Sequence, residues 1–155
     1  MTIKKWLFLI GLLCILSSCG NESALEPSNK ANEKLDLTHI STKNNDTSQH
    51  PANQAKDALS KYKEITEVKA VNTTKQLIIA VQVEQNKRFN LTSIRKQLQK
   101  EMKKKFPDHK VELTTDKKIV IELKKLEEKL QSESISKKKV EKRVKEIIKL
   151  SKEQT

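Results

Sequence analysis

A strict alternation of side chains over residues 76–85 is the strongest constraint on how this 155-residue chain folds. One face of the segment carries Leu77, Ile79, Val81 and Val83, and the other carries Ile78, Ala80, Gln82 and Glu84. This period of two predicts a β-strand. A polar turn at 72–75 separates it from a β-branched run at 68–71, so we expect the two segments to pair as an antiparallel hairpin.

Apolar residues at helical spacing flank this hairpin on both sides. The stripe of the first helix is Ala55, Ala58, Leu59 and Tyr62, and that of the second is Leu91, Ile94, Leu98, Met102 and Phe106. The first helix is expected to end near Lys63. The second is expected to begin at Asn90 or Thr92 and to stop at Pro107. A short alternation at 111–114 then predicts a third strand beside the hairpin.

Residues 118–123 fit either a β-strand or an α-helix. Their β-branched run favours a fourth strand paired with 111–114, whereas Ile119, Leu123, Leu126 and Leu130 share one helical face, with Thr115 or Asp116 as a cap. A last helix is expected after Ser136, and its narrow apolar stripe is Val140, Val144, Ile147, Ile148 and Ser151. The pattern predicts an α+β fold: a small αββαβ domain, with an antiparallel sheet packed by helices, followed by one or two charged C-terminal helices.

The N-terminus has the pattern of an export signal. Lys4 and Lys5 precede an unbroken apolar run of about eleven residues at 6–16, which is shorter than the ~20 residues that cross a bilayer. Leu16-Ser17-Ser18-Cys19 then has the form of a bacterial lipobox. We predict a lipoprotein signal peptide at 1–18, with cleavage between Ser18 and Cys19.

Cys19 is the predicted lipidation site, because a thiol is nucleophilic enough at mild pH to take the lipid. The covalent group would be a diacylglycerol thioether, with or without an N-acyl chain, and no other cofactor and no metal is expected. The predicted location is the extracytoplasmic face of the cell membrane. The alternatives are an ordinary secretory signal cut near Ser18 and a retained transmembrane helix, although no positive cluster follows Gly20 to stop transfer.

Cleavage changes the composition of the chain that must fold. Loss of Lys4 and Lys5 lowers the net charge from +12 to +10, and loss of Cys14 with lipidation of Cys19 leaves no disulfide. Residues 19–51 are rich in Asn, Ser, Thr and Lys and are expected to form a disordered tether behind the lipidated cysteine. The folded domain is therefore predicted at 52–155.

Three stretches match a known family. They are DALSKYKEITEVKAV, then QLIIAVQVE, then LTSIRKQLQKEMKKKFP leading into KVELTTD. With the lipobox and polar spacer before them, they resemble the sporulation lipoproteins of the YhcN/YlaJ type over about 52–150. The resemblance implies helix rather than strand from Asp116. It also implies a non-enzymatic accessory role in sporulation, germination or outgrowth, in the spore or forespore membrane.

Catalytic motifs are missing from the sequence. His39 and His50 fall in the predicted tether and His109 in a loop, no His pair has metal-ligand spacing, and the chain has only the glycines Gly11 and Gly20. These observations argue against a metal site, a Gly-rich phosphate loop and an enzyme.

Lysine clusters are the remaining functional signal. Lys100, Lys103, Lys104 and Lys105 crowd the end of the second helix, where Glu101 is the lone acid, whereas acids are mixed among the lysines of the last helix. We interpret the first cluster as a candidate contact with anionic lipid, wall polymer or another spore envelope protein. The alternative is a solvated helix face without a partner. Export and the scarcity of aromatic residues argue against nucleic acid. The alternative function is an envelope interaction module that binds anionic lipid, peptidoglycan or wall polymer and is unrelated to sporulation. A solute receptor is a third interpretation that the small size disfavours.

Overall fold

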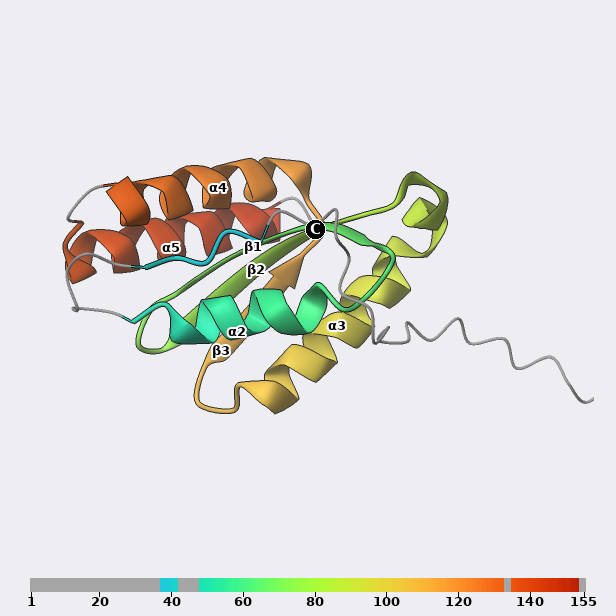
Figure 1. Cartoon of the computed structure of the whole chain (residues 1–155), viewed down its shortest axis with the longest axis horizontal. Coiled ribbons are helices and arrows are strands. Elements are labelled where there is room, and N and C mark those ends of the chain that lie inside the picture. The colour runs from blue at the N-terminus through green and yellow to red at the C-terminus, as the bar shows by residue number, and fades with distance from the viewer. Residues whose placement is uncertain (1–36, 42–47, 133–134, 154–155) are drawn as a thin grey trace, which may run out of the picture.

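The computed structural model describes residues 37–41, 48–132 and 135–153. The helices are α2 (His50–Leu59), the 3-10 helix η1 (Gln85–Asn90), α3 (Leu91–Lys105), α4 (Lys117–Ser132) and α5 (Lys137–Glu153). The strands are β1 (Ile65–Asn72), β2 (Gln76–Val83) and β3 (Lys110–Thr114). This order confirms the predicted α+β class and the αββαβ domain with two helices after it (Figure 1).

The predicted hairpin is present. β1 and β2 pair antiparallel, with Val68 opposite Val81 and Val71 opposite Ile78. Thr73 closes the turn, because its N–H donates to the Gln76 carbonyl at 2.8 Å and its hydroxyl oxygen accepts from the Gln76 N–H at 3.0 Å. The first strand is longer than its β-branched run suggested, since β1 extends over Ile65–Asn72.

The third strand corrects the prediction of an antiparallel sheet. β3 pairs parallel to β2, so the sheet is mixed, with the order β1-β2-β3. The reason is the crossover through η1 and α3, which returns the chain to the end of the sheet where β2 began. There, the Lys110 N–H donates to the Lys75 carbonyl at 2.8 Å and places the first residue of β3 beside the start of β2.

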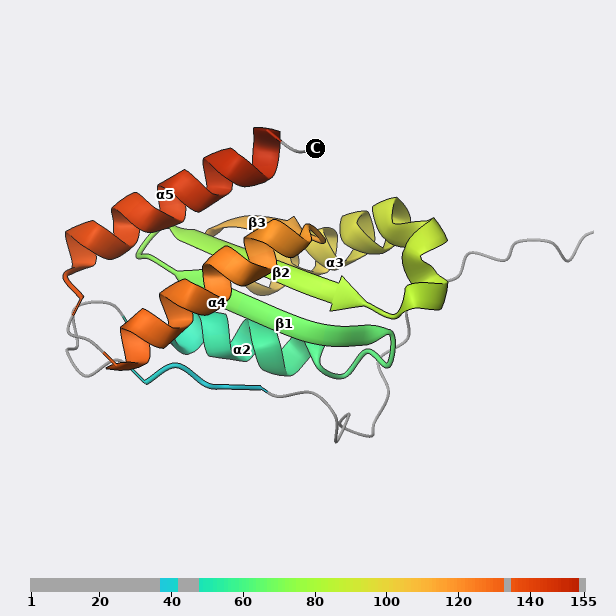
Figure 2. The same ribbon diagram turned by 90° about the horizontal axis from the view of Figure 1, so that it is seen from above.

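Helices cover both faces of the sheet. α2 and α3 lie on one face, and α4 and α5 lie on the other (Figures 1 and 2). The alternation predicted for β2 divides its side chains between two cores. Leu77, Ile79 and Val81 are buried with α2 and α3, whereas Ile78 and Ala80 are buried with α4 and α5. A central strand that is apolar on both sides therefore holds the three layers together.

The ambiguous segment 118–123 is the first part of α4, as the resemblance implied. Ile119 and Leu123 are fully buried, and the Asp116 carboxylate accepts the Lys118 N–H at 2.7 Å at the helix start. α5 begins at Lys137, directly after Ser136, and it docks on the same face. Val144 is fully buried in the core that α4 and α5 share, so the last helix does not project from the domain.

Residues before Ala52, the predicted start of the domain, also pack against the helices and strands. α2 begins at His50, and residues 37–41, which we call the strap, lie along α2 beside β1 (Figure 2). Ile40 of the strap is only 4% exposed, and its N–H and carbonyl both bond to the side chain of Asn53, at 2.9 and 3.0 Å. The buried Ile40 and its two bonds to Asn53 are thus among the contacts that hold the strap against α2. Residues 19–36 and 42–47 of the predicted tether lie outside the described residues.

Candidate functional site

The residues with the clearest predicted chemistry, Ser18 and Cys19, lie outside the described residues. The predicted contact lysines are described, and they occupy the C-terminal half of α3. Lys100, Lys103, Lys104 and Lys105 are all exposed. They face outward because Ile94, Leu98 and Met102, on the opposite side of the helix, are buried against the sheet.

The structure brings three of these four lysines together. Lys100, Lys103 and Lys104 border a shallow depression of about 530 Å³ that also includes Lys96 and Gln99. Lys105 differs, since its ammonium lies 5.9 Å from the centre of the Phe106 ring and not on the depression. Lys96 is the member that sequence reasoning missed. The available signal was its position four residues before Lys100, which is itself four residues before Lys104.

The lone acid of this cluster is turned away from the lysines. The Tyr62 hydroxyl, from the segment between α2 and β1, donates to a carboxylate oxygen of Glu101, which is half-buried. Burial and the nearby carboxylate raise the pKa of Tyr62, so the hydroxyl keeps its proton and remains a donor. Across the described ranges, no salt bridge joins an acid to the lysines that border the depression.

α5 is also rich in basic residues, but two of them are paired with acids. Arg143 binds Glu122 of α4 at 3.1 Å and Glu146 of its own helix at 2.7 Å, and Lys149 lies 3.8 Å from Glu153. The acids mixed into the sequence of α5 therefore neutralise part of its surface. α3 is the stronger candidate for contact with an anionic partner.

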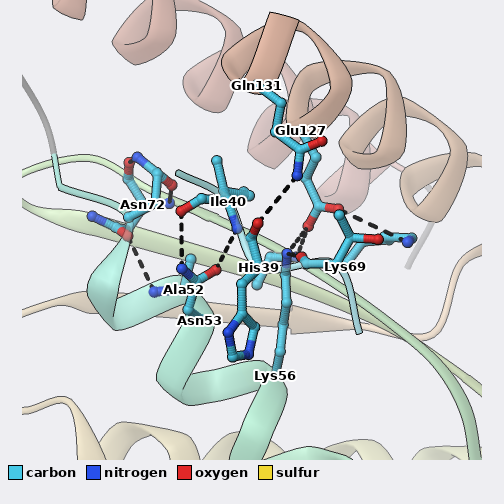
Figure 3. Close-up of polar contacts among 12 residues, drawn as sticks. His39, Ile40, Ala52, Asn53, Lys56, Lys69, Asn72, Glu127 and Gln131 are labelled. Carbon is cyan, nitrogen blue, oxygen red and sulfur yellow. Dashed lines mark hydrogen bonds and ion pairs between the residues drawn. The ribbon is translucent and has the colours of Figure 1, made fainter. Parts of the chain in front are cut away.

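A second group of charges was not predicted at all. The group lies at the outer edge of β1 and consists of Lys56 of α2, Lys69 of β1 and Glu127 of α4 (Figure 3). Their exposed fractions are only 1%, 6% and 3%, respectively. The available signal was a charge inside an apolar stripe. Lys56 lies among Ala52, Ala55 and Leu59, and Glu127 lies four residues after Leu123.

Glu127 is the centre of this group. Its Oε1 accepts from the Lys56 ammonium at 2.7 Å and from the Ala70 N–H at 2.8 Å, while its Oε2 lies 3.9 Å from the Lys69 ammonium. Lys56 also donates to the Thr38 carbonyl of the strap at 2.8 Å. The contact joins helices from opposite faces of the sheet around the β1 edge, and it gives the Ala70 N–H of this edge strand a partner.

Burial dominates the electrostatics of this pair. Desolvation raises the pKa of Glu127 and lowers the pKa of Lys56, and in each case the attraction of the partner opposes the shift. The Coulomb attraction thus only partly offsets the free energy of removing both charges from water.

The three histidines do not form a site in the described residues. His39 bonds to Asp57 at 2.7 Å, His50 begins α2, and His109 lies in the turn before β3, as predicted. Within the described ranges, no three His, Cys, Asp or Glu side chains are grouped closely enough to hold a metal ion.

Comparison with protein-family models, with curated proteins and with solved structures finds no match to this chain. The resemblance to the sporulation lipoproteins therefore stays a prediction. Among the described helices, none combines the length and the apolar character needed to cross a membrane.

Proposed function

We propose that this chain is a non-enzymatic lipoprotein of the cell or spore envelope, anchored through Cys19, whose folded domain contacts anionic surfaces through α3. The observation that carries the contact is the basic depression bordered by Lys96, Lys100, Lys103 and Lys104, from which the lone acid Glu101 is turned away. The partner is an anionic lipid headgroup layer, on which the anchor already places the protein.

The expected strength follows from the number of lysines. Each Lys near an anionic membrane contributes about 1 kcal/mol, so three of them supply about 3 kcal/mol, or roughly 100-fold in affinity. The contribution decreases with salt because the lysines are exposed. Alone this is weak binding. Beside a lipid anchor it is enough to set which face of the domain lies on the membrane.

Vesicle co-sedimentation tests the contact. The protein is the chain from residue 19 to 155 with Cys19→Ser, so that partitioning reports the domain and not the lipid. We expect binding to phosphatidylcholine vesicles that contain phosphatidylglycerol, loss of binding in high salt, and a drop of roughly 100-fold when Lys100, Lys103 and Lys104 are all replaced by Gln.

The matched control removes the same charge from α5. Lys138, Lys142 and Lys145 are exposed, and their replacement by Gln changes the net charge equally. Equal losses for the two triple variants would mean that only net charge matters, and the α3 contact would be abandoned. The absence of binding by the parent protein would also refute it.

The anchor and the cellular role have separate tests. A labelled fatty acid is expected to be incorporated into the full chain and lost in Cys19→Ser, and label retained by that variant would overturn the anchor. The accessory role in sporulation, germination or outgrowth rests on the family resemblance alone. Equal abundance in vegetative cells and spores would favour the alternative, an envelope module unrelated to sporulation.

A further inference from the structure

A pocket of about 340 Å³ lies beside the buried charges at the β1 edge. The strap contributes Thr38 to its wall, β1 contributes Thr66 and Lys69, and α4 contributes Glu127 and Gln131. The volume is within the range of small-molecule sites, at the lower end. This pocket is on a different part of the molecule from the α3 depression, and it shares no residue with it.

Two polar groups of largely buried residues, the Lys69 ammonium and the Glu127 carboxylate, line this pocket, and each has bonding capacity left for a ligand. The Lys69 ammonium lies 3.9 Å from Glu127 Oε2 and 3.9 Å from Glu67 Oε1, beyond the 2.7–3.2 Å of a hydrogen bond. In the part of the chain that the structure describes, neither the Lys69 ammonium nor Glu127 Oε2 forms a shorter side-chain contact than these. By contrast, Glu127 Oε1 has two, Lys56 and the Ala70 N–H. The pocket therefore presents a donor and an acceptor side by side.

A hydroxyl group fits this pair. It can accept a hydrogen bond from Lys69 and donate its own proton to Glu127, whereas a carboxylate could only accept and an ammonium could only donate. The charges of the lining also favour a neutral ligand. The lining has two basic residues, Lys69 and Lys124, and three acidic ones, Glu67, Glu127 and Glu128. Lys56, which is paired with Glu127, makes the positive and negative charges equal in number. An anion or a cation would meet as much repulsion as attraction.

We propose that this pocket binds a neutral, hydroxyl-bearing sugar residue. One sugar hydroxyl bridges Lys69 and Glu127 at the floor, and the others bond to the Thr66 hydroxyl and to the polar rim. The proposal does not depend on the contact through α3. A free sugar and a residue of a glycan chain present the same hydroxyl groups, and the experiment separates these two sources.

Two-dimensional ¹H–¹⁵N NMR of the chain 19–155 with Cys19→Ser tests the site. The probes are N-acetylglucosamine and its β-1,4-linked trimer, with glucuronate and glucosamine as charged analogues. We expect saturable shifts of the Ala70 amide, which donates to Glu127, and of Thr66, with at least tenfold weaker binding of both charged sugars. Tighter binding of the trimer would identify a glycan chain as the source, and equal binding a free sugar.

Two variants test the geometry. Lys69→Met removes the donor and keeps the aliphatic stem, and it is expected to weaken sugar binding at least tenfold. Thr66→Val changes an exposed residue at the rim of the pocket, so this variant can be tested even if Lys69→Met fails to fold. We expect it to bind sugar severalfold more weakly than the parent protein. Lys100→Gln on α3 is the control and should bind normally. The proposal is overturned if no saturable shift appears up to ~10 mM sugar, which is ten times the ~1 mM Kd typical of a weak site. It is also overturned if Thr66→Val binds sugar as tightly as the parent protein.

Discussion

The edge of β1 and the outer face of α3 use lysine in opposite ways. At the edge, Lys56 is 1% exposed and is bonded to Glu127 and to the strap carbonyl of Thr38. On α3, Lys100, Lys103 and Lys104 are exposed, and no acid in the described ranges is paired with them. The same residue type joins layers of the fold in one place and is left available to a partner in the other.

The difference shows that position, not composition, decides what a basic residue contributes. A buried ion pair loses hydration on both groups and is tolerated only with good geometry and further hydrogen bonds. An exposed lysine has lost little hydration, so its removal hardly changes stability and its charge remains free for binding. We therefore expect substitutions at the β1 edge to change folding and substitutions on α3 to change binding.

The largest expected effect is on the buried pair. Glu127→Leu leaves the Lys56 ammonium buried without its carboxylate and the Ala70 N–H without an acceptor, so we expect a loss of about 3–5 kcal/mol in the free energy of unfolding. Adding Lys56→Met should recover most of this loss, because burial already disfavours both charges. Urea denaturation measures all three proteins.

The control for this comparison is the α3 variant with Lys100, Lys103 and Lys104 replaced by Gln. Its free energy of unfolding should stay within about 0.5 kcal/mol of the parent protein. If Glu127→Leu were as mild as that control, or if the double variant were no better than the single one, the pair would not be the element that joins α2 to α4.

Periodicity explains what the sequence could predict. The β2 alternation and the apolar stripes of α3 and α5 depend only on local spacing. The structure confirms them, except that Leu91 at the start of the α3 stripe is only partly buried. The direction of β3 depends on where the crossover ends, which spacing does not encode. The meeting of Lys56 with Glu127 depends on two helices reaching around one strand edge, and the withdrawal of Glu101 depends on Tyr62 from a separate segment. Such long-range contacts could not be inferred from either stretch alone.

An intermediate effect is expected from Gln49, an uncharged group at the same strand edge. Its side-chain amide accepts from the Asn72 N–H at 3.0 Å and donates to the Asn72 carbonyl at 2.9 Å, as a neighbouring strand would. Gln49→Ala should cost about 1–3 kcal/mol, because it leaves buried backbone groups of β1 unpaired. Hydrogen exchange should accelerate at the Asn72 amide.

The matched substitution is Gln85→Ala, which removes an exposed glutamine at the start of η1. It should leave both the stability and the exchange of Asn72 unchanged. Equal stability losses in the two variants would show that the side-chain cap on β1 has no particular value, and that charge pairing alone protects this edge.

The smallest expected effect is the pH dependence of Glu122, a partly exposed counterpart of Glu127 on the same helix. Hydrogen bonds from Lys125, and secondarily from Arg143, hold the pKa of Glu122 below its usual 4.5. The folded state therefore binds this proton less tightly than the unfolded state, and the stabilisation is present above pH ~4.5 and is lost as the pH falls through the lowered pKa. Glu127 has the opposite sign, since its raised pKa makes its contribution to stability decline as the pH rises.

The difference in unfolding free energy between the parent protein and Glu122→Gln cancels the Glu127 contribution, because both proteins retain that residue. This difference should be up to about 1 kcal/mol near neutral pH, shrink in high salt, and vanish once the pH is well below the lowered pKa of Glu122. A difference that persisted at low pH would mean that Glu122 stabilises α4 by packing and not by its charge.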